Sequence, residues 1–355
     1  MSKPIHNPSG TSSNRGVTLI ELMVAVAVSL ILFSMAFTLA QQLNNTADVV
    51  SSMSDVNENL RAAVNMVSRD LAQAGQNIPV GGIPIPSGGS STTAINRPGP
   101  TAATFPATGY LSVLTPGYGL GPTQGSGANA INTDIVNIIG VNQFSSFNQT
   151  PVTANPTVNA GGATITVSTT AAGYVVPGLL IMLTNSNASC LLAVSSVNTS
   201  TGVITFTHGD ATNDPLGVNQ FWGSPATGTI NQLQTSGTGA WPAITAYPIS
   251  MTTYYLDTST PRRLMKQITL GSAQPVALGI NVMTITYTCS SGTSPTRNPS
   301  SPSSIQKVAL TMIGETDHQN HLSLQWYSKS ITNAVAIQNL DFHNKFNLNA
   351  SLQQN

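Results

Sequence analysis

A long apolar run near the N-terminus constrains this 355-residue chain more than any other feature. Residues 17–40, VTLIELMVAVAVSLILFSMAFTLA, are 24 residues in which Glu21 is the single charge, and no other charge occurs between Arg15 and Asp48. A helix of this length measures about 36 Å, more than the ~30 Å hydrocarbon core of a bilayer. The run therefore predicts a transmembrane helix, which we place at residues 17–42.

The charges on either side of the run predict its orientation. Lys3 and Arg15 precede it and acidic residues follow it, which favours a cytoplasmic N-terminus and an exported remainder. A secretory signal peptide would have a shorter apolar core followed by a small-residue cleavage site. An ordinary single-pass anchor would leave Glu21 unexplained, because a carboxylate within the membrane costs roughly 2.5–3.5 kcal/mol. Glu21 is therefore predicted to be functional and to need a charged partner.

The residues around this glutamate carry a specific resemblance. The stretch RGVTLIE, residues 15–21, resembles the processing site of type IV prepilins and of the pseudopilins of type II secretion. The resemblance implies that a prepilin peptidase cleaves after Gly16 and that Val17 becomes the N-methylated first residue. It also implies that Glu21 pairs with the terminal ammonium of a neighbouring subunit, so that two buried charges neutralise each other and fix the axial register.

The sequence departs from the family pattern at two points, of which the second bears on the kind of subunit. The family usually begins its mature chain with Phe, where this sequence has Val17. Major pilins often carry a proline within the apolar segment, whereas none occurs here between Pro8 and Pro79. The missing proline fits a subunit unlike the main component of a fibre.

The helical pattern continues beyond the membrane segment. Apolar residues recur every three or four positions at Leu43, Ala47, Val50, Met53, Val56, Leu60, Val64, Val67, Leu71 and Ala74. Gly75 and Pro79 then supply stop signals. We expect one helix from about Val17 to Ala74, amphipathic over 43–75, with this second part packed on a globular head.

The stretch ENLRAAVNMVSRDLAQAG, residues 58–75, resembles a signature of the PilW-like minor pilins and, more loosely, of the J-type pseudopilins. Residues 274–289 and 323–342 resemble C-terminal strands of the same family, although Gln338 stands where an arginine is usual. The resemblance implies major and minor pilin subunits, the prepilin peptidase and an inner-membrane assembly platform as partners. It covers residues 15–75 and 250–342 and is absent from about 76 to 250.

Beyond the helix the sequence predicts a β-rich head, residues 76–355. Residues 75–130 are rich in Gly, Pro, Ser and Thr and predict loops with short strands at most. Strands are expected at 134–141, 163–169, 178–184, 191–197, 203–208, 246–256, 264–269, 282–289, 305–313 and 322–328, with a hairpin turn near 199–202. The predicted fold class is therefore α+β, one long helix on an antiparallel head.

Charge is distributed unevenly along the chain. Of 24 charged residues, 12 of each sign, only Arg97, Asp134, Asp210 and Asp214 lie between residues 71 and 256. We interpret approximately 76–245 as a variable loop and β insertion, with the first 16 residues as the leader. The net charge of zero removes the basic surface on which nucleic-acid binding depends, so no nucleic-acid partner is predicted.

Candidate chemical sites are few. Glu315, Asp317, His318 and His321 form the single titratable cluster, and Asp210 and Asp214 lie four residues apart. Neither has convincing zinc or calcium spacing, so no metal is predicted. The GYGLG stretch, residues 117–121, opens no helix, and P-loop, GxSxG and HExxH motifs are missing from the sequence. The chain is predicted to be neither an enzyme nor a cofactor binder.

Cys190 and Cys289 are the only cysteines. An exported head lies in an oxidising compartment, which favours a disulfide between them over two separate buried thiols.

The sequence as a whole predicts a minor-pilin-like structural subunit that is anchored in the inner (cytoplasmic) membrane and later found in a pilus at the cell surface. Two alternatives remain: a pseudopilin of a type II secretion system, and a membrane-tethered adhesin or carbohydrate-binding protein.

Overall fold

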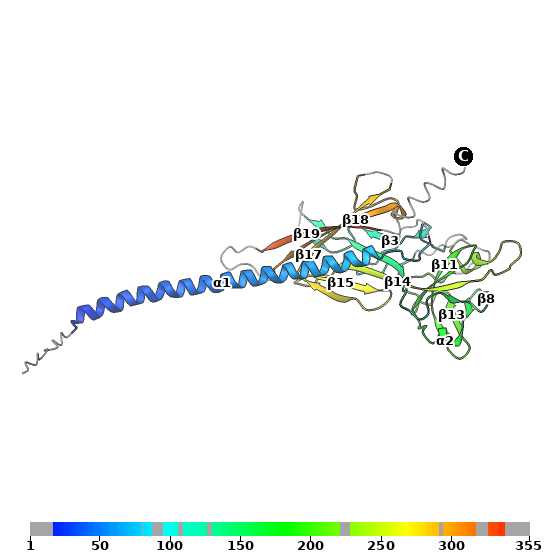
Figure 1. The fold of residues 1–355 in the computed structure, drawn as a ribbon, viewed down its shortest axis with the longest axis horizontal. Helices are drawn as coiled ribbons and strands as arrows, with labels where there is room; N and C mark the ends of the chain where they lie inside the picture. Colours follow the sequence, from blue (N-terminus) through cyan, green and yellow to red (C-terminus); the bar gives the residue numbers. More distant parts are fainter. Residues whose placement is uncertain are drawn as a thin grey trace, which may run out of the picture.

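The first element of the computed structural model is a single helix, α1, Leu19–Ala72, which is 54 residues long and projects far beyond the head (Figure 1). The structure describes residues 17–79, 81–86, 95–105, 109–125, 130–220, 228–290, 294–316 and 326–337. Gly75 follows the helix with φ +75°, a backbone conformation in which glycine ends helices. The predicted helix from Val17 to Ala74 is thus confirmed to within two residues at each end.

The head covers only the last third of this helix. The buried residues of α1 share one stripe that begins at Val56 and includes Leu60, Val64, Val67 and Leu71. The same stripe is exposed closer to the N-terminus, where Leu43 and Val50 are 70% and 60% exposed. The amphipathic pattern starts at Leu43, but the helix becomes buried against the head only from Val56, about four turns further along α1.

The remaining elements are mostly short strands. In order they are β1 Ile83–Pro84, β2 Tyr110–Leu111, β3 Leu114–Gly117, β4 Thr123–Gln124, β5 Ile131–Asn132, β6 Ile135–Val141, β7 Thr150–Pro151, β8 Ala154–Asn159, β9 Gly162–Thr166, α2 Thr169–Ala172, β10 Leu180–Thr184, β11 Ser189–Ala193, β12 Ser196–Asn198, β13 Val203–Thr207, η2 Ile230–Leu233, β14 Thr245–Leu256, β15 Arg263–Ile268, β16 Gln274–Leu278, β17 Ile280–Cys289, η3 Pro302–Ser304, β18 Ile305–Glu315 and β19 Ser328–Ala336.

An eight-stranded antiparallel sheet forms the larger part of the head. Its path is β11-β10-β14-β15-β16, and the twelve-residue β14 also pairs with β6 and β7 along its length. A second sheet, β17-β18-β19, adjoins it, and the end of α1 packs on the head with one face, while residues such as Arg61 and Arg69 on its other face stay exposed. In the view of Figure 1, β19 and β15 appear on opposite sides of the helix. Residues from both sheets and from α1 share one hydrophobic cluster, which is the main core.

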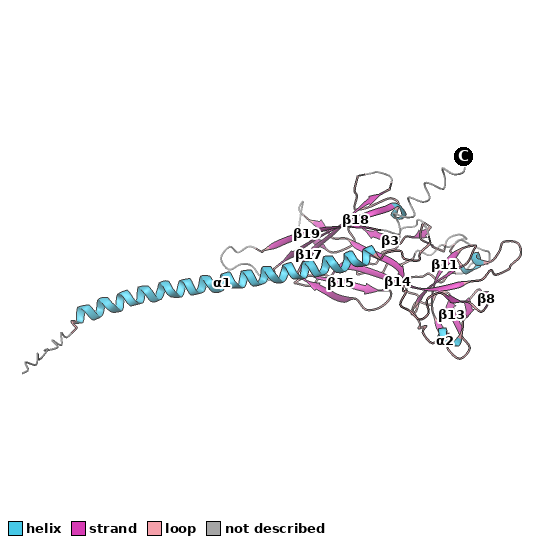
Figure 2. Ribbon diagram, viewed as in Figure 1, coloured by secondary structure: helices cyan, strands magenta, loops and turns pink. Residues whose placement is uncertain are grey.

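A smaller lobe lies at the end of the head far from the free helix (Figure 2). It is built on the four-stranded sheet β12-β13-β9-β8 and on α2, and its own hydrophobic cluster centres on Phe147, Phe206 and Ile165. The lobe shares β10 and β11 with the main sheet, because alternate residues of these strands face opposite clusters. The α+β fold class is confirmed.

Most expected strands are present, and two differences are found. The stretch 191–197 is split, because Ala193 ends β11 and Ser196 begins β12 in another sheet. The hairpin of β12 and β13 has its turn at 199–202, as expected, with Gly202 at φ +72°. Of the expected strand 322–328, residues 322–325 lie outside the described residues, and the strand that the structure shows begins at Ser328. The insertion boundary at 76–245 stays a prediction.

The expected disulfide is wrong. Cys190 and Cys289 are both buried and both free. Cys190, on β11, faces the cluster of the small lobe, whereas Cys289, at the end of β17, belongs to the main core. Burial raises the pKa of Cys190 to about 12, so its thiol stays protonated and poorly reactive at neutral pH.

The two thiols can be counted directly. We expect the exported protein, denatured without reductant and treated with an alkylating reagent, to gain two labels by intact mass. If the protein gained no label before reduction and two labels after it, the two cysteines would form a disulfide.

Candidate functional site

The first helical turn of α1 contains the predicted glutamate. Thr18 caps the helix, because its side-chain oxygen accepts a hydrogen bond from the backbone N–H of Glu21 at 3.3 Å. The Glu21 carboxylate accepts in return from the backbone N–H of Thr18 at 3.0 Å and from its hydroxyl at 3.1 Å. This reciprocal capping box fixes the start of the helix. It uses one carboxylate oxygen, Oε2, and leaves Oε1 without a partner among the described residues.

The surface around Glu21 is apolar and uncovered. Val17, Leu19 and Ile20 are 72%, 77% and 70% exposed, and no part of the most apolar stretch of α1 is buried by the head. By length and composition α1 is the one helix among the described residues that is able to cross a membrane. A carboxylate on such a surface is stabilised when a cation meets it in the same apolar environment.

The predicted modification site adjoins this turn. Val17 directly precedes the capping residue Thr18, which places its backbone nitrogen near the end of the helix that carries Glu21. Gly16, after which cleavage is predicted, lies outside the described residues. Cleavage after Gly16, methylation of Val17 and pairing through Glu21 stay predictions.

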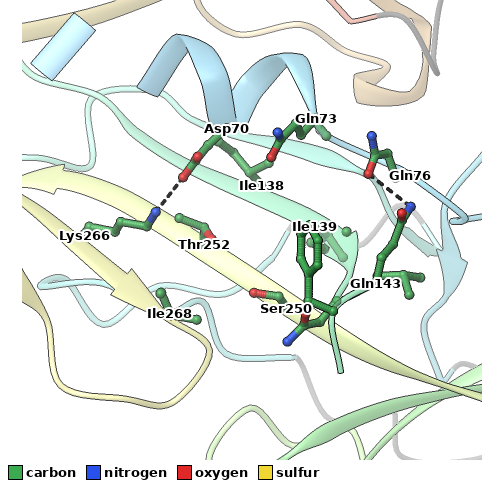
Figure 3. Close-up of a pocket in the computed structure, with 15 residues that line it drawn as sticks. Asp70, Gln73, Gln76, Ile138, Ile139, Gln143, Ser250, Thr252, Lys266 and Ile268 are labelled. Atoms are coloured by element: carbon green, nitrogen blue, oxygen red, sulfur yellow. Dashed lines mark hydrogen bonds and ion pairs between the residues drawn. The ribbon is translucent and has the colours of Figure 1, made fainter. Parts of the chain in front are cut away.

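At its other end α1 is joined to the head by Asp70. The Asp70 Oδ2 atom accepts from the Tyr254 hydroxyl and from Lys266 Nζ, both at 2.7 Å, and Arg69 Nε lies 3.6 Å from Oδ1. Tyr254 is on β14 and Lys266 on β15, so one carboxylate connects the helix with two neighbouring strands. Figure 3 shows the ion pair of Asp70 with Lys266. Burial, followed by the hydrogen bond to Asp70, raises the pKa of Tyr254. The Arg-Asp-Leu part of the helix signature therefore has a structural role.

A groove of about 330 Å³ opens beside this connection. The end of α1, the β6–β7 connection and β15 line it, and Gln143 donates to Gln76 across it at 3.1 Å (Figure 3). Phe144 is fully exposed at the groove and Ile268 is 53% exposed. The groove holds no cluster of three His, Cys, Asp or Glu side chains, since none occurs among the described residues.

A buried ion pair lies under the GYGLG stretch. Asp134 is 1% exposed and accepts from the backbone N–H groups of Gly119 at 2.9 Å and Ile285 at 2.8 Å. Arg297 donates to both carboxylate oxygens of Asp134, at 2.7 and 3.1 Å, and stacks over the Tyr118 ring at 4.8 Å. The glycine-rich stretch thus covers a salt bridge that joins β6, β17 and a loop.

Arg97 lies beside this pair. Its Nη2 atom donates to the Pro116 carbonyl at 2.6 Å, and the absent side chain of Gly117 leaves room for Nη1. Burial lowers the pKa of Arg97 to about 10, which still leaves it charged at neutral pH. The sequence did not reveal this cluster, although it contained a hint: Arg97 and Asp134 are two of the four charges in the charge-poor middle segment.

The other two charges in that segment shape a turn. Asp214 accepts from the backbone N–H groups of Gly217 and Val218 at 3.0 Å and of Asn219 at 2.7 Å. Asp210 accepts from Asn213 through both its oxygens. Both carboxylates are thus occupied by hydrogen bonds within the turn. Glu315 accepts from Asn281, whereas Asp317, His318 and His321 lie outside the described residues.

Comparison with known proteins gives one match. Residues 11–37 match the model of the prokaryotic N-terminal methylation motif, so this end of the chain is type IV prepilin-like. The matched range includes Gly16, Val17, Thr18 and Glu21 and most of the uncovered apolar surface. No curated protein and no solved structure matches the chain.

Proposed function

We propose that the chain is a structural subunit of a type IV pilus, specifically a minor pilin of PilW-like type. The observation that carries the proposal is the methylation motif at residues 11–37, which begins a 54-residue helix whose apolar half no part of the head covers. A prepilin peptidase would cleave after Gly16 and methylate Val17. The helix would first anchor the subunit in the inner membrane, with its N-terminus cytoplasmic, and would later pack among other helices in a polymer.

Assembly in this proposal depends on one charge pair and on apolar burial. The Val17 ammonium of an incoming subunit meets the Glu21 carboxylate of its neighbour, which has one free oxygen beside the capping contacts. The exposed side chains between Val17 and Leu39 then leave lipid for a helix bundle, where close packing is the driving force. No catalytic step and no cofactor is needed, and we propose that the chain is not an enzyme.

The minor position is supported by the helix signature and by the head. Asp70, which belongs to the signature at residues 58–75, holds the helix on β14 and β15. The head adds a lobe with a separate core to the two sheets on which the helix packs. Such a head suits a subunit present in few copies that primes assembly or lies at the tip, where its bulk is not repeated along the fibre.

The processing step gives the first test. We expect the intact mass of the membrane-associated protein to correspond to a chain that starts at Val17 and carries one methyl group. Gly16→Val is expected to leave the 16-residue leader attached, because it alters the residue after which the peptidase cuts. Gly10→Val is the matched control and should be processed normally. A mature chain that starts anywhere else would contradict the proposal.

The same motif also serves a pseudopilin of type II secretion. Deletion of the gene distinguishes the two machines: loss of surface pili supports the pilus subunit, and loss of protein secretion with pili intact supports the pseudopilin.

A further inference from the structure

One outer edge of the head is an open strand. β19 is the last strand of the sheet β17-β18-β19 and pairs with β18 through all nine of its residues. The bonds Thr316 N–H to Tyr327 O at 3.0 Å and Ile337 N–H to Gln306 O at 2.9 Å continue this ladder at both ends. Since antiparallel pairs alternate, the odd-numbered residues of β19 direct their N–H and C=O groups toward β18.

The even-numbered residues direct theirs away from β18. These are Ser328, Ser330, Thr332, Ala334 and Ala336, and their backbone groups have no partner among the described residues. All five are small, uncharged and exposed, and β19 contains no proline. An edge of this kind is a template for another extended chain.

The outer strands of the three larger sheets other than β19 are protected. On β17, the opposite edge of the same sheet, the Met283 carbonyl accepts from the Asp134 N–H at 2.9 Å, the Ile285 N–H donates to the Asp134 carboxylate at 2.8 Å, and Tyr287 pairs with Thr296. β7 has only two residues, one of which is a proline. β3, β8 and β16 each contain a proline, at Pro116, Pro156 and Pro275, and β12 has only three residues. On β11, Asn219 takes up the backbone N–H and C=O of Ala193 at 2.9 and 2.8 Å. Proline, shortness and side-chain capping are devices that block edge pairing. Among the described residues, the head thus protects these strands and leaves the nine-residue β19 open.

We propose that the edge of β19 binds an extended segment of a different subunit by β-strand addition, and this rests on the proposed role in assembly. Main-chain hydrogen bonds to the five outward residues would supply the affinity, and the small side chains would admit a partner strand without selecting for charge. The partner is therefore an extended stretch of at least five residues in the head of a neighbouring pilin-type subunit.

A second copy of β19 in antiparallel pairing does not fit this edge. Antiparallel pairing of two β19 strands uses a two-fold axis that reverses everything attached to them. α1 runs beside β19 (Figure 1), and Asn333 on β19 donates to Ser68 on α1 at 2.8 Å. The two apolar helix halves would then point in opposite directions and could not enter one membrane from the same side. This excludes antiparallel pairing of two copies, and the occupant that we propose is a different segment.

A proline at Ala334 tests the edge with little disturbance of the fold. Ala334→Pro removes an outward N–H and leaves the hydrogen bonds to β18 intact, while Ala334→Ser keeps the N–H as the matched control. Full-length variants are expressed in cells that lack the native gene, and the polymers sheared from the surface are quantified. We expect wild type and Ala334→Ser at equal levels and Ala334→Pro at least tenfold lower, with equal amounts in the membrane. Recovery of Ala334→Pro at the wild-type level would overturn the proposal.

Hydrogen exchange of the wild-type chain tests the same edge without a substitution, so the result does not depend on whether Ala334→Pro folds correctly. In detergent, the amides of Ser330, Thr332, Ala334 and Ala336 should exchange quickly, and in sheared polymers at least tenfold more slowly. The odd-numbered amides should be slow in both states. The edge proposal, but not the proposed function, would be overturned if the even-numbered amides exchanged at equal rates in both states or slowly in detergent. A β19–β19 crosslink would overturn it as well. Absence of the wild-type chain from the polymers would overturn the proposed function itself.

Discussion

Glu21→Gln is expected to abolish incorporation of the chain into surface polymers while leaving the helix intact. Glutamine keeps an oxygen that accepts the capping hydrogen bonds from Thr18, which glutamate makes at 3.0 and 3.1 Å, but it removes the charge. The ammonium of the neighbouring subunit would then be buried without a counter-charge, at a cost of about 3–5 kcal/mol. That cost corresponds to a loss of more than a hundredfold in the assembly equilibrium, since about 1.4 kcal/mol is tenfold.

The measurement is the ratio of sheared to membrane-bound protein, with two comparison variants. Glu21→Ala loses both the cap and the charge and should fail to the same degree as Glu21→Gln. Glu58→Gln alters another exposed glutamate of α1 and should assemble normally. If Glu21→Gln assembled and Glu21→Ala did not, the carboxylate would serve only as a helix cap, and the charge-pair mechanism would be excluded.

The second large effect concerns the stability of the head. Asp134→Ala is expected to lower the free energy of unfolding by about 3–5 kcal/mol, because it leaves the Arg297 guanidinium half-buried without its counter-charge. It also removes the acceptor of two backbone N–H groups, those of Gly119 and Ile285. A loss of this size is a large part of the 5–15 kcal/mol that stabilises a typical protein. Urea unfolding of the full-length chain in detergent, followed by tryptophan fluorescence, measures it.

Asp210→Ala provides the comparison for this variant. Asp210 accepts hydrogen bonds in an exposed turn and has no cationic partner among the described residues, so its loss should destabilise the head far less than the loss of Asp134. Equal destabilisation by the two variants would show that the buried ion pair contributes nothing beyond its backbone contacts.

The long helix was predictable because its causes are local. The apolar run, the periodic stripe and the glycine after it all lie in one continuous stretch of about 60 residues. The ends of the helix that they predict agree with the ends of α1. The extent of burial was not predictable, since Leu43 and Val56 belong to the same stripe and only the position of the head separates them. The paired strands with a short turn, β12 and β13, were recognisable for the same local reason.

Features that depend on distant residues were missed or wrong. Asp70 was recognised as part of a signature, but its partner Lys266 lies 196 residues away and no pattern connects the two. The same holds for Asp134 and Arg297, 163 residues apart. The prediction of a disulfide was wrong because a count of cysteines contains no information on which hydrophobic core each cysteine faces. The isolated charges in the charge-poor segment were a hint of buried polar contacts that the sequence analysis did not use. Three of the four, Arg97, Asp134 and Asp214, are buried.

The uncovered part of α1 between the predicted membrane segment and the head determines how far the head lies from the membrane surface. Residues 43–51 are helical, contain no buried side chain, and span about 13 Å at 1.5 Å per residue. The headgroup layer on one side of a bilayer is only about 5–8 Å thick. The head of a membrane-anchored subunit is therefore held in water, beyond the lipid headgroups, before it joins any polymer. Contacts between heads would consequently form in an aqueous layer, independently of which lipids surround the anchor.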